Sequence, residues 1–409
     1  MHSLQFQFSI PRYVFGKTAG RWVPSLLWNS GLSCLKYDRQ MSAPVLPNDE
    51  WVKIKVTYGG ICGSDLNLIH LHDSPSASAL TSFPFTIGHE VVGKVCETGK
   101  KATDLRKGDR VVVDPILSCL ARGISNPCEA CRKGDYSLCT RMTDGDISPG
   151  PLIGACRDTG GSWSSYLVAH QIQVLKLPEE VDDLNGVMVE PFSCALHSVL
   201  RNRPGKDDTV LVIGAGTIGI CVVAALRALD IPCKIIVMYK YDYQGKLAMH
   251  YGADQVIRFS RGNHYVDEIA EAVHAKVLKP LFGSPVVVGG ADQVFECVGK
   301  SSSINDALRL VRSGGKVVLL GLAGILDRID WTAVWLNEID VKGSFAYGTE
   351  QYHGKPMRTL QIAIELMKSG KVDLSPLITH RFPLEKYKDA FQTIVNKRSK
   401  GCMKVVFEP

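Results

Sequence analysis

The amino-acid sequence predicts a protein of two large parts, one predominantly β and one α/β, with a parallel sheet covered by helices. The chain has 409 residues, a length at which one hydrophobic core normally gives way to about two or three domains. Up to about residue 180, short strand-like runs are interrupted by glycine, proline and aspartate. From about residue 207, apolar strands alternate with helical stretches, the pattern of a parallel sheet wrapped by helices.

The expected elements follow this division. In the first part, strands are expected at 51–58, 91–95 and 110–113. In the second part, strands are expected at 210–213, 235–238, 255–257, 293–297 and 316–320. After residue 347, the sequence predicts helices at 359–368 and 384–396 and a final strand at 402–407. The stretch through Asn48 is assigned to strands of the β part and to nothing else.

Composition excludes several classes of protein. The chain is 45% hydrophobic and 22% charged, unlike a disordered or fibrous chain. Its 47 basic residues exceed its 41 acidic ones, but they are scattered, so no nucleic-acid partner is expected. The N-terminus lacks the pattern of a signal peptide, and no stretch approaches the ~18 apolar residues of a membrane span. We therefore expect a soluble, cytoplasmic protein with no membrane partner.

A glycine-rich turn follows the strand at 210–213. The sequence VLVIGAGTIGI runs from this strand through three glycines into a helix ending near Leu229. Such glycines permit a tight turn, close approach to a pyrophosphate and close helix packing, while the helix N-terminus attracts phosphate. Because further βα units follow, we interpret the turn as a dinucleotide site. The residues expected to contact the cofactor here are Gly214, Gly216, Thr217, Ile218 and Gly219.

The end of the next strand bears on the choice between NAD and NADP. An Asp or Glu about 20 residues after the glycines normally binds the ribose 2′-hydroxyl of NAD. Counting from Gly219 reaches Tyr239, and Lys240 follows it. A lysine at this position favours the 2′-phosphate of NADP, with Tyr239 and Lys240 as contacts. The alternative is that Lys240 is a solvated residue and that Asp242 meets the ribose of NAD.

Cysteines are concentrated in one short loop. The chain has 13 cysteines, too few for a disulfide scaffold. Four of them, Cys119, Cys128, Cys131 and Cys139, match a closed, tetrahedral structural zinc site. The alternatives are four unligated thiols and a redox C-x-x-C pair. The redox alternative is disfavoured because the pair does not open a helix after a strand.

A dispersed set of residues matches a catalytic zinc site. Cys62 lies in the sequence GICGSDL, His89 in GHEVVG and Glu190 in VEPF. A thiolate, an imidazole and a carboxylate would provide three protein ligands and leave a fourth position open, as catalytic zinc requires. Taken singly, these residues would more often be a buried thiol, a core histidine and an acid near a helix N-terminus.

Together these motifs resemble the zinc-dependent medium-chain alcohol dehydrogenase superfamily from about Trp51 to the C-terminus. The family's glycine-histidine-glutamate motif is present at 88–90, its C-G-[ST]-D motif at 62–65 and its nucleotide turn at 214–219. The pair Glu190 and Pro191 is similar to the threonine, polyol and sugar dehydrogenase branch. The segments FECVG from residue 295 and GGKVVLLG from residue 314 resemble the family's later Rossmann strands, which adds Cys297, Val298 and Gly299 to the expected cofactor contacts.

The resemblance implies a GroES-like catalytic domain that is split by an inserted Rossmann domain. The expected boundaries are 1–186 for the catalytic domain with its structural zinc lobe, 187–347 for the Rossmann domain and 348–409 for the return to the catalytic domain. It implies hydride transfer between NADP, or NAD, and an alcohol or carbonyl, with two zinc ions per chain. Ser64 would pass the substrate proton outward, Asp65 would orient His89, and Glu90 would lie beside the metal.

The sequence departs from the family pattern at two places. Many members carry a proton-relay histidine five residues after the cysteine ligand, where this chain has Asn67. His70 or His72 could replace it, or both could be solvated loop residues. The first zinc-lobe cysteine, Cys119, is separated from Cys128 by LARGISNP, so a longer loop is required.

The sequence narrows the substrate only to a class. We expect a secondary alcohol, a polyol, a sugar or an amino alcohol, and a homodimer or homotetramer by family resemblance. One alternative is an NADPH-dependent reductase of iminium groups or activated double bonds on the same fold. A second alternative is a non-catalytic nucleotide-binding protein. Candidate cleft residues for the substrate are Phe85, Cys156, Arg157 and Trp163.

Overall fold

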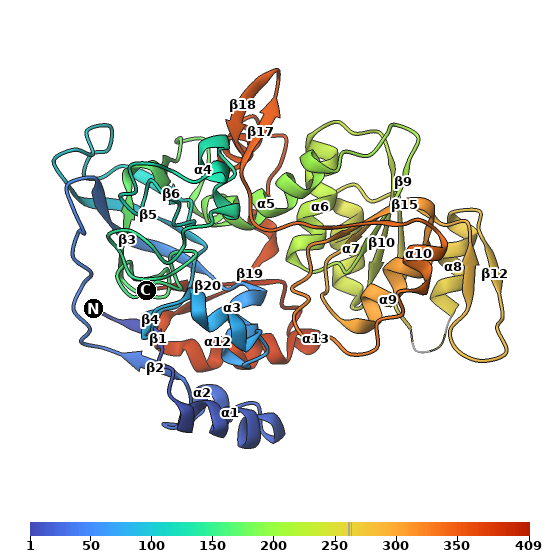
Figure 1. The fold of residues 1–409 in the computed structure, drawn as a ribbon, viewed down its shortest axis with the longest axis horizontal. Coiled ribbons are helices and arrows are strands. Elements are labelled where there is room, and N and C mark those ends of the chain that lie inside the picture. The colour runs from blue at the N-terminus through green and yellow to red at the C-terminus, as the bar shows by residue number, and fades with distance from the viewer. Residues whose placement is uncertain (261, 263) are drawn as a thin grey trace. The chain divides into compact units, whose positions relative to one another are not determined.

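The computed structural model describes residues 1–260, 262 and 264–409. Its internal contacts divide the chain into two compact units (Figure 1). The first unit comprises residues 1–190 and 347–409, and the second comprises residues 191–346. The first unit is therefore discontinuous in sequence, and its C-terminal segment returns to it after the second unit is complete. Within the described residues, no helix is long and apolar enough to cross a membrane.

The first unit is built on a seven-stranded sheet. Its strands are β3 (Trp51–Gly60), β5 (Val91–Thr98), β6 (Arg110–Val113), β7 (Tyr166–His170), β8 (Val174–Lys176), β19 (Ile378–Pro383) and β20 (Lys404–Glu408). The order is β19-β20-β3-β5-β6-β8, and β7 also pairs with β3. Because β20 pairs antiparallel with β3, the end of the chain completes the sheet that its beginning starts. The predicted strands at 51–58, 91–95, 110–113 and 402–407 are thus confirmed, with shifts of a few residues at their ends.

The N-terminal segment contains helices, so the prediction of strands alone was wrong. Strands β1 (Ser3–Phe6) and β2 (Leu35–Asp38) pair with each other, and β1 also pairs with β4 (Phe85–Thr86). Between them lie α1 (Ile10–Trp22) and α2 (Leu26–Asn29). Glycine disfavours a helix by intrinsic propensity, and α1 contains Gly16 and Gly20. Their missing side chains leave room for Leu71 and Leu27, a tertiary contact that sequence propensity does not reveal.

The other elements of the first unit surround its sheets. The helices are α3 (Gly63–Ile69), α4 (Glu129–Lys133), α11 (Thr359–Lys368), α12 (Tyr387–Val395) and α13 (Lys397–Lys400), with α5 (Asp183–Arg201) running on into the second unit. The predicted helices at 359–368 and 384–396 are confirmed as α11 and as a short 3₁₀ turn followed by α12. A hairpin of β17 (Thr349–Tyr352) and β18 (Lys355–Arg358) was not predicted.

The second unit is built on a six-stranded parallel sheet. Its strands are β9 (Thr209–Ile213), β10 (Lys234–Tyr239), β11 (Gln255–Arg258), β14 (Ala291–Glu296), β15 (Val311–Leu319) and β16 (Asp340–Gly343). The order β11-β10-β9-β14-β15-β16 is that of a doubly wound dinucleotide-binding sheet. The five predicted strands of this part are confirmed.

Five helices and a small hairpin complete the second unit. The helices are α6 (Thr217–Ala228), α7 (Asp242–His250), α8 (His264–Ala272), α9 (Ser301–Leu310) and α10 (Thr332–Leu336). The hairpin consists of β12 (Lys276–Leu278) and β13 (Val286–Val288), which are partly exposed.

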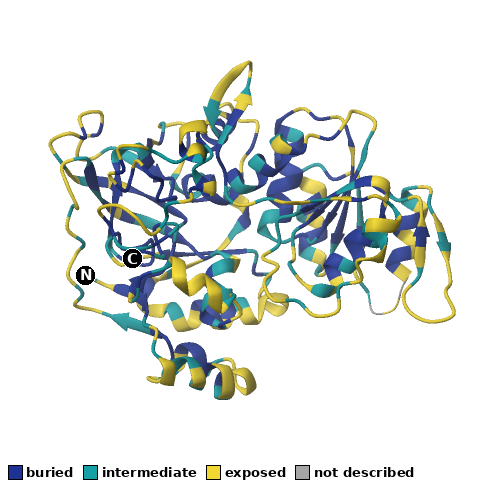
Figure 2. Cartoon of the chain, viewed as in Figure 1, coloured by how far each residue is buried: buried dark blue, intermediate teal, exposed yellow. Residues whose placement is uncertain are grey.

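Each unit has its own buried core (Figure 2). In the second unit, strand residues such as Leu211 and Val294 are buried with Ile269 of α8 and Ala307 of α9. In the first unit, one cluster gathers around Trp51 and a second gathers around Trp163 and Phe391. Two independent cores explain why either unit can be considered on its own.

Candidate functional site

The dispersed residues of the first unit meet at one place. Cys62 immediately precedes α3, while His89 and Glu90 lie in the turn before β5. One ligand atom from each of these three residues lies within 4.8 Å of the others. Asp65, in the first turn of α3, accepts a hydrogen bond from the Cys62 backbone N–H at 2.8 Å. The start of α3 therefore holds the thiol of Cys62 in place beside His89.

Asp65 also faces the imidazole of His89. The distance from His89 Nδ1 to Asp65 Oδ1 is 3.5 Å, and both side chains are largely buried. Burial opposes protonation of the ring, but the charges of Asp65 and Cys62 outweigh it and raise the pKa of His89 well above its ordinary value. A carboxylate at Nδ1 leaves Nε2 as the nitrogen for a metal ion, the usual arrangement of a metal-binding histidine.

Two buried polar atoms at this place lack hydrogen-bond partners among the described residues. They are Glu90 Oε1 and Ser64 Oγ. Such atoms are rare in folded proteins, because an unsatisfied buried polar group costs free energy. Zinc would satisfy a carboxylate oxygen beside a thiolate and an imidazole, and a substrate hydroxyl would satisfy Ser64. The residues present therefore fit a zinc ion with an open position.

Glu190 lies next to this group rather than within it. It is a buried residue of α5 and is not among the three whose ligand atoms lie within 4.8 Å of one another. Burial raises the pKa of Glu190 to about 7, while the charge of His89 lowers it and that of Glu90 raises it. Sequence reasoning assigned the ligand role to Glu190 and a neighbouring role to Glu90, whereas the closer of the two carboxylates in this structure is Glu90.

Lys404 is a functional candidate that sequence reasoning missed. It lies on β20, is fully buried, and donates to Ile61 O at 3.0 Å and to Glu90 Oε2. Burial lowers the pKa of Lys404, but the charge of Glu90 more than offsets this and raises it. Lys404 is therefore a buried cation that fixes one oxygen of Glu90 and leaves the other free. Its signal in the sequence is a lysine within an otherwise apolar final strand.

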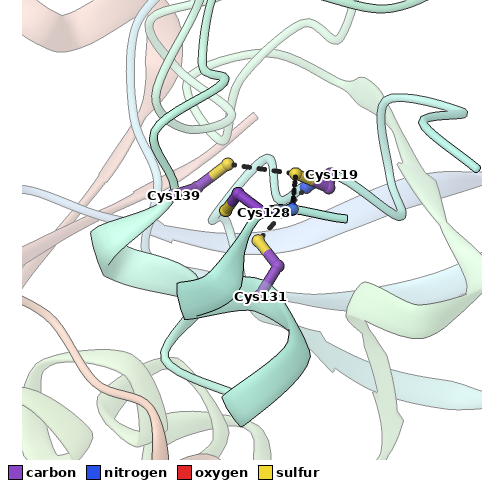
Figure 3. Close-up of side chains that lie close together, drawn as sticks. All are labelled: Cys119, Cys128, Cys131 and Cys139. Carbon is purple, nitrogen blue, oxygen red and sulfur yellow. Dashed lines mark hydrogen bonds between the residues drawn. The ribbon is translucent and has the colours of Figure 1, made fainter. Parts of the chain in front are cut away.

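The four cysteines of the zinc lobe converge at a second place (Figure 3). All four Sγ atoms lie within 4.8 Å of one another. Cys119 Sγ accepts from the Cys128 N–H at 3.4 Å, and Cys131 Sγ accepts from the Cys119 N–H at 3.5 Å. A hydrogen bond from Cys131 lowers the pKa of Cys139 to about 5. Four sulfur atoms at one point are the ligand set of a closed structural zinc site.

Arg122 explains how the long loop after Cys119 folds. Its side chain is fully buried and donates to four backbone carbonyls of the segment that follows the last cysteine. These acceptors are Asp144 O, Ile147 O, Ser148 O and Gly150 O, at 2.8, 3.1, 3.2 and 2.6 Å. The loop thus carries its own anchor, which lets Cys119 reach the cluster from eight residues before Cys128.

The β17–β18 hairpin docks on the same lobe. Thr349 Oγ1 donates to Gly134 O at 3.2 Å. Arg358 forms an ion pair with Asp114 and lies over the ring of Tyr136, 5.6 Å from its centroid. The segment that returns after the second unit therefore stabilises the loop that carries the cysteines.

The nucleotide turn of the second unit has the predicted geometry. Gly214 has φ +100°, a conformation that favours glycine. A Cβ on Gly219 would collide with Gly214 O, whereas no atom lies within 4 Å of a Cβ built on Gly216. Gly216 therefore faces open space at the start of α6, where Thr217 and Ile218 lie in the first turn.

The loop after β14 lies beside this turn. A Cβ on Gly214 would collide with the side chain of Val298. Glu296 Oε1 accepts from the backbone N–H groups of Val298 and Gly299, both at 2.9 Å. Burial raises the pKa of Cys297 well above its ordinary value, so its thiol stays protonated. These contacts lie at the point between β9 and β14 where the strand order reverses, the usual dinucleotide site of this fold.

The remaining candidates have other surroundings. His70 ends α3 and stacks on His72, with ring centroids 5.6 Å apart, while Asn67 lies within α3. Phe85, Cys156 and Trp163 are buried in the cores of the first unit, and Trp163 Nε1 donates to Gly60 O at 2.9 Å. Arg157 is exposed and donates to Phe83 O. The buried positions of the first three residues are explained by packing.

Comparisons with known proteins agree with this geometry. Residues 48–179 match the family model of the alcohol dehydrogenase GroES-like domain, and residues 217–361 match that of the zinc-binding dehydrogenase. L-idonate 5-dehydrogenase of Vitis vinifera is 32% identical over 93% of this chain and 93% of its own. Sorbitol dehydrogenase of Arabidopsis thaliana is 31% identical over 93% of this chain and 94% of its own.

A solved structure extends the comparison to the fold. A zinc-binding dehydrogenase from Sinorhizobium meliloti 1021, bound to NADP, is 26% identical, with a TM-score of 0.68, over 92% of this chain and 95% of that one. Together with the two family models, this confirms the predicted fold class, a GroES-like domain combined with a Rossmann-like domain.

Proposed function

The chain belongs to the zinc-dependent medium-chain alcohol dehydrogenase superfamily, and we propose that it exchanges hydride between NADP and a polyol, a sugar or an amino alcohol. It is an oxidoreductase that acts on CH–OH groups and uses a nicotinamide cofactor. The names of the relatives, an idonate and a sorbitol dehydrogenase, support a polyhydroxylated substrate that is oxidised at a secondary carbon. The single observation that carries this proposal is the buried, unpartnered Ser64 Oγ beside Cys62, His89 and Glu90.

We propose that Cys62 and His89 hold the catalytic zinc, with a glutamate as the third protein ligand. The position of Glu90 within 4.8 Å of both favours it for that role, and Glu190 stays a candidate from the adjoining helix α5. When bound, zinc supplies a Lewis acid next to the alcohol oxygen. In this proposal Lys404 holds Glu90 in place, and Asp65 holds the imidazole of His89.

Ser64 is the residue that we expect to handle the substrate proton. Its hydroxyl is buried at the start of α3 and has a free acceptor and a free donor. During alcohol oxidation, the hydride leaves the substrate carbon for the nicotinamide, and the hydroxyl proton leaves through Ser64 toward solvent. His70 and His72, at the end of the same helix, are candidates for the outer part of that path.

We further propose a second, structural zinc held by Cys119, Cys128, Cys131 and Cys139, and the use of NADP. The convergence of the four sulfur atoms supports the former. Lys240 at the end of β10 supports the latter, as does the NADP bound to the Sinorhizobium meliloti relative. The proposed domains are 1–186 and 348–409 for catalysis and 187–347 for the nucleotide, near the limits of the two compact units.

We also propose a homodimer or homotetramer in the cytoplasm. Strand β16 lies at the edge of the parallel sheet, and the preceding helix α10 exposes Trp335 and Leu336. An edge strand next to exposed apolar side chains supports association between copies of the second unit. Light scattering coupled to gel filtration measures the mass directly, and a monomer would contradict this part of the proposal.

The function is tested with a panel of polyols, sugars and amino alcohols, each with NADP and NAD, by following nicotinamide absorbance. We expect turnover of at least one secondary alcohol and a content of two zinc ions per chain. Turnover of an iminium or an activated double bond, but of no alcohol, would instead support the reductase alternative. Absence of turnover with every substrate would support the non-catalytic alternative.

A pair of serine variants locates the chemistry. Ser64→Ala should lower kcat about 100-fold, because the proton acceptor is lost, and Ser64→Thr should restore part of the rate. Ser78→Ala, in an exposed turn of the same unit, is the matched control. A rate for Ser64→Ala equal to that of the control would remove Ser64 from the proposed mechanism.

A further inference from the structure

We propose that Arg258, together with Lys240, binds the 2′-phosphate of NADP, and that Asp242 serves as the partner of Arg258 rather than as the acceptor for a ribose hydroxyl. This inference rests on the proposed use of NADP and assigns the residue that determines it. Neither Arg258 nor the pairing of Asp242 is evident from the spacing of the glycine motif, because Arg258 belongs to the next strand along the chain.

The register of the parallel sheet brings Arg258 to the end of β10. Strands β10 and β11 are neighbours, and Tyr239 is directly opposite Arg258. These are the last residues of their strands, so both lie at the carboxyl edge of the sheet, where a dinucleotide binds in this fold. Lys240 follows Tyr239 immediately and lies over the ring of Tyr241, with its Nζ 5.5 Å from the centroid. Two exposed cations thus flank the expected position of the adenosine ribose.

The backbone donors of this turn are already used. The Gln244 side chain, through Oε1, accepts from the N–H of Lys240 at 3.3 Å and from that of Tyr241 at 3.1 Å. Gln244 is buried, so this arrangement belongs to the folded turn itself. A phosphate at the turn therefore depends on side-chain cations rather than on these two amides.

Asp242 is the only acidic residue of the turn 239–244, and it faces Arg258. The distance from Arg258 Nη1 to Asp242 Oδ1 is 3.3 Å, and both side chains are more than half exposed. An exposed pair of this kind is weak, so it does not prevent a phosphate from recruiting the guanidinium. Arginine has five N–H donors and can hold a carboxylate and a phosphate together. With Lys240 added, two cations oppose one carboxylate, a balance that suits the 2′-phosphate.

The alternative, in which Asp242 binds the ribose diol of NAD, makes the opposite prediction for one variant. If Asp242 only holds Arg258, then Asp242→Asn removes a negative charge beside the phosphate and strengthens NADPH binding. If Asp242 accepts hydrogen bonds from the ribose, the same variant weakens NADH binding. The sign of this effect therefore separates the two arrangements.

The experiment measures dissociation constants of NADPH and NADH by nicotinamide fluorescence, and of 2′,5′-ADP and 5′-AMP by calorimetry, on the full chain. Arg258→Met should weaken NADPH and 2′,5′-ADP about 10- to 100-fold and change NADH and 5′-AMP by less than about 3-fold. Lys240→Met should act in the same direction and more weakly, because lysine offers a point charge instead of a fork. Asp242→Asn should tighten NADPH about 2- to 5-fold and leave NADH unchanged.

Arg312→Met is the matched control. Arg312 is also a partly exposed arginine of the second unit and forms an ion pair with Asp292 at 2.7 Å, but it lies at the amino end of β15. It should change none of the four affinities, and circular dichroism should show that all variants keep the wild-type fold.

Each outcome bears on a different claim. Tighter binding of NADH than of NADPH by the wild type would overturn the proposed use of NADP. A wild type that prefers NADPH, together with an Arg258→Met variant that keeps this preference, would overturn the role of Arg258 alone. Weaker NADH binding by Asp242→Asn would overturn the role of Asp242. None of these measurements depends on turnover of an alcohol, so failure of the proposed catalysis remains distinguishable.

Discussion

The two candidate metal centres of the first unit are built in contrasting ways. The cysteine lobe takes all four residues from one stretch, 119–139, and the sulfur atoms accept hydrogen bonds from the local backbone. The second centre takes Cys62 from the start of a helix and His89 and Glu90 from a turn, with Lys404 contributed by the last strand. One centre is local and uniform, and the other is assembled from distant segments.

The contrast in unpartnered atoms indicates the role of each centre. Beside the dispersed centre, Ser64 Oγ and Glu90 Oε1 are buried without partners among the described residues. In the cysteine lobe, the buried atom without a partner is Arg122 Nε, a donor on the anchoring side chain rather than a ligand. A closed set of thiolates suits a structural ion, and a mixed set with spare polar atoms suits a substrate. The comparison therefore predicts that damage to the lobe lowers stability, whereas damage to the dispersed centre lowers turnover.

The largest expected effect is the loss of a lobe cysteine. Cys131→Ser should lower the free energy of unfolding by more than about 4 kcal/mol, because the lobe loses its metal. Thermal unfolding and zinc content are the measurements. Cys96→Ser is the control, since Cys96 donates to Lys53 O and a serine can do the same. An unchanged melting temperature for Cys131→Ser would show that the lobe does not need a metal.

The dispersed centre should show the reverse behaviour. His89→Ala should reduce kcat/KM on the order of 10³-fold while shifting the melting temperature by only a few degrees. The control is His353→Ala, in the exposed turn between β17 and β18. Unfolding of the His89 variant with loss of both zinc ions would contradict the distinction between the two centres.

Arg122 tests how the lobe is held together apart from its metal. Arg122→Met would leave four carbonyls without their donor and should cost about 3 kcal/mol of stability. Chemical denaturation measures this loss. Arg132→Met, on the exposed face of α4 in the same lobe, should have little effect. Equal stability of the two variants would mean that the loop does not depend on Arg122.

The smallest expected effect concerns the support of His89. Asp65→Asn should lower zinc affinity at the dispersed centre about 10- to 100-fold and leave the lobe zinc in place. Titration with a chelator, followed by metal analysis, would release one zinc ion per chain earlier than in the wild type. Asp144→Asn, at an exposed position of the lobe, is the control. Simultaneous release of both ions would remove the special role of Asp65.

The elements predicted best are those with local signals. The turn at 214–219 and the cysteine cluster depend on residue types at short spacing, and their geometry follows directly from those types. The helices α1 and α2 were missed because glycine propensity argues against α1, while contacts with Leu71 and Leu27 decide its form. The β17–β18 hairpin was missed because its contacts with Tyr136 and Asp114 join residues more than 200 positions apart.

The sequence by itself determined the family, the fold class and the residue types available for chemistry, because these depend on composition, periodicity and motif spacing. Only the tertiary structure decided which carboxylate lies nearest Cys62 and His89, since Glu90 and Glu190 are equally plausible from their motifs. It likewise decided that Lys404 neutralises Glu90 and that Arg258 stands opposite Tyr239. These pairings depend on sheet register and on burial, and both arise from contacts between segments that the sequence keeps far apart.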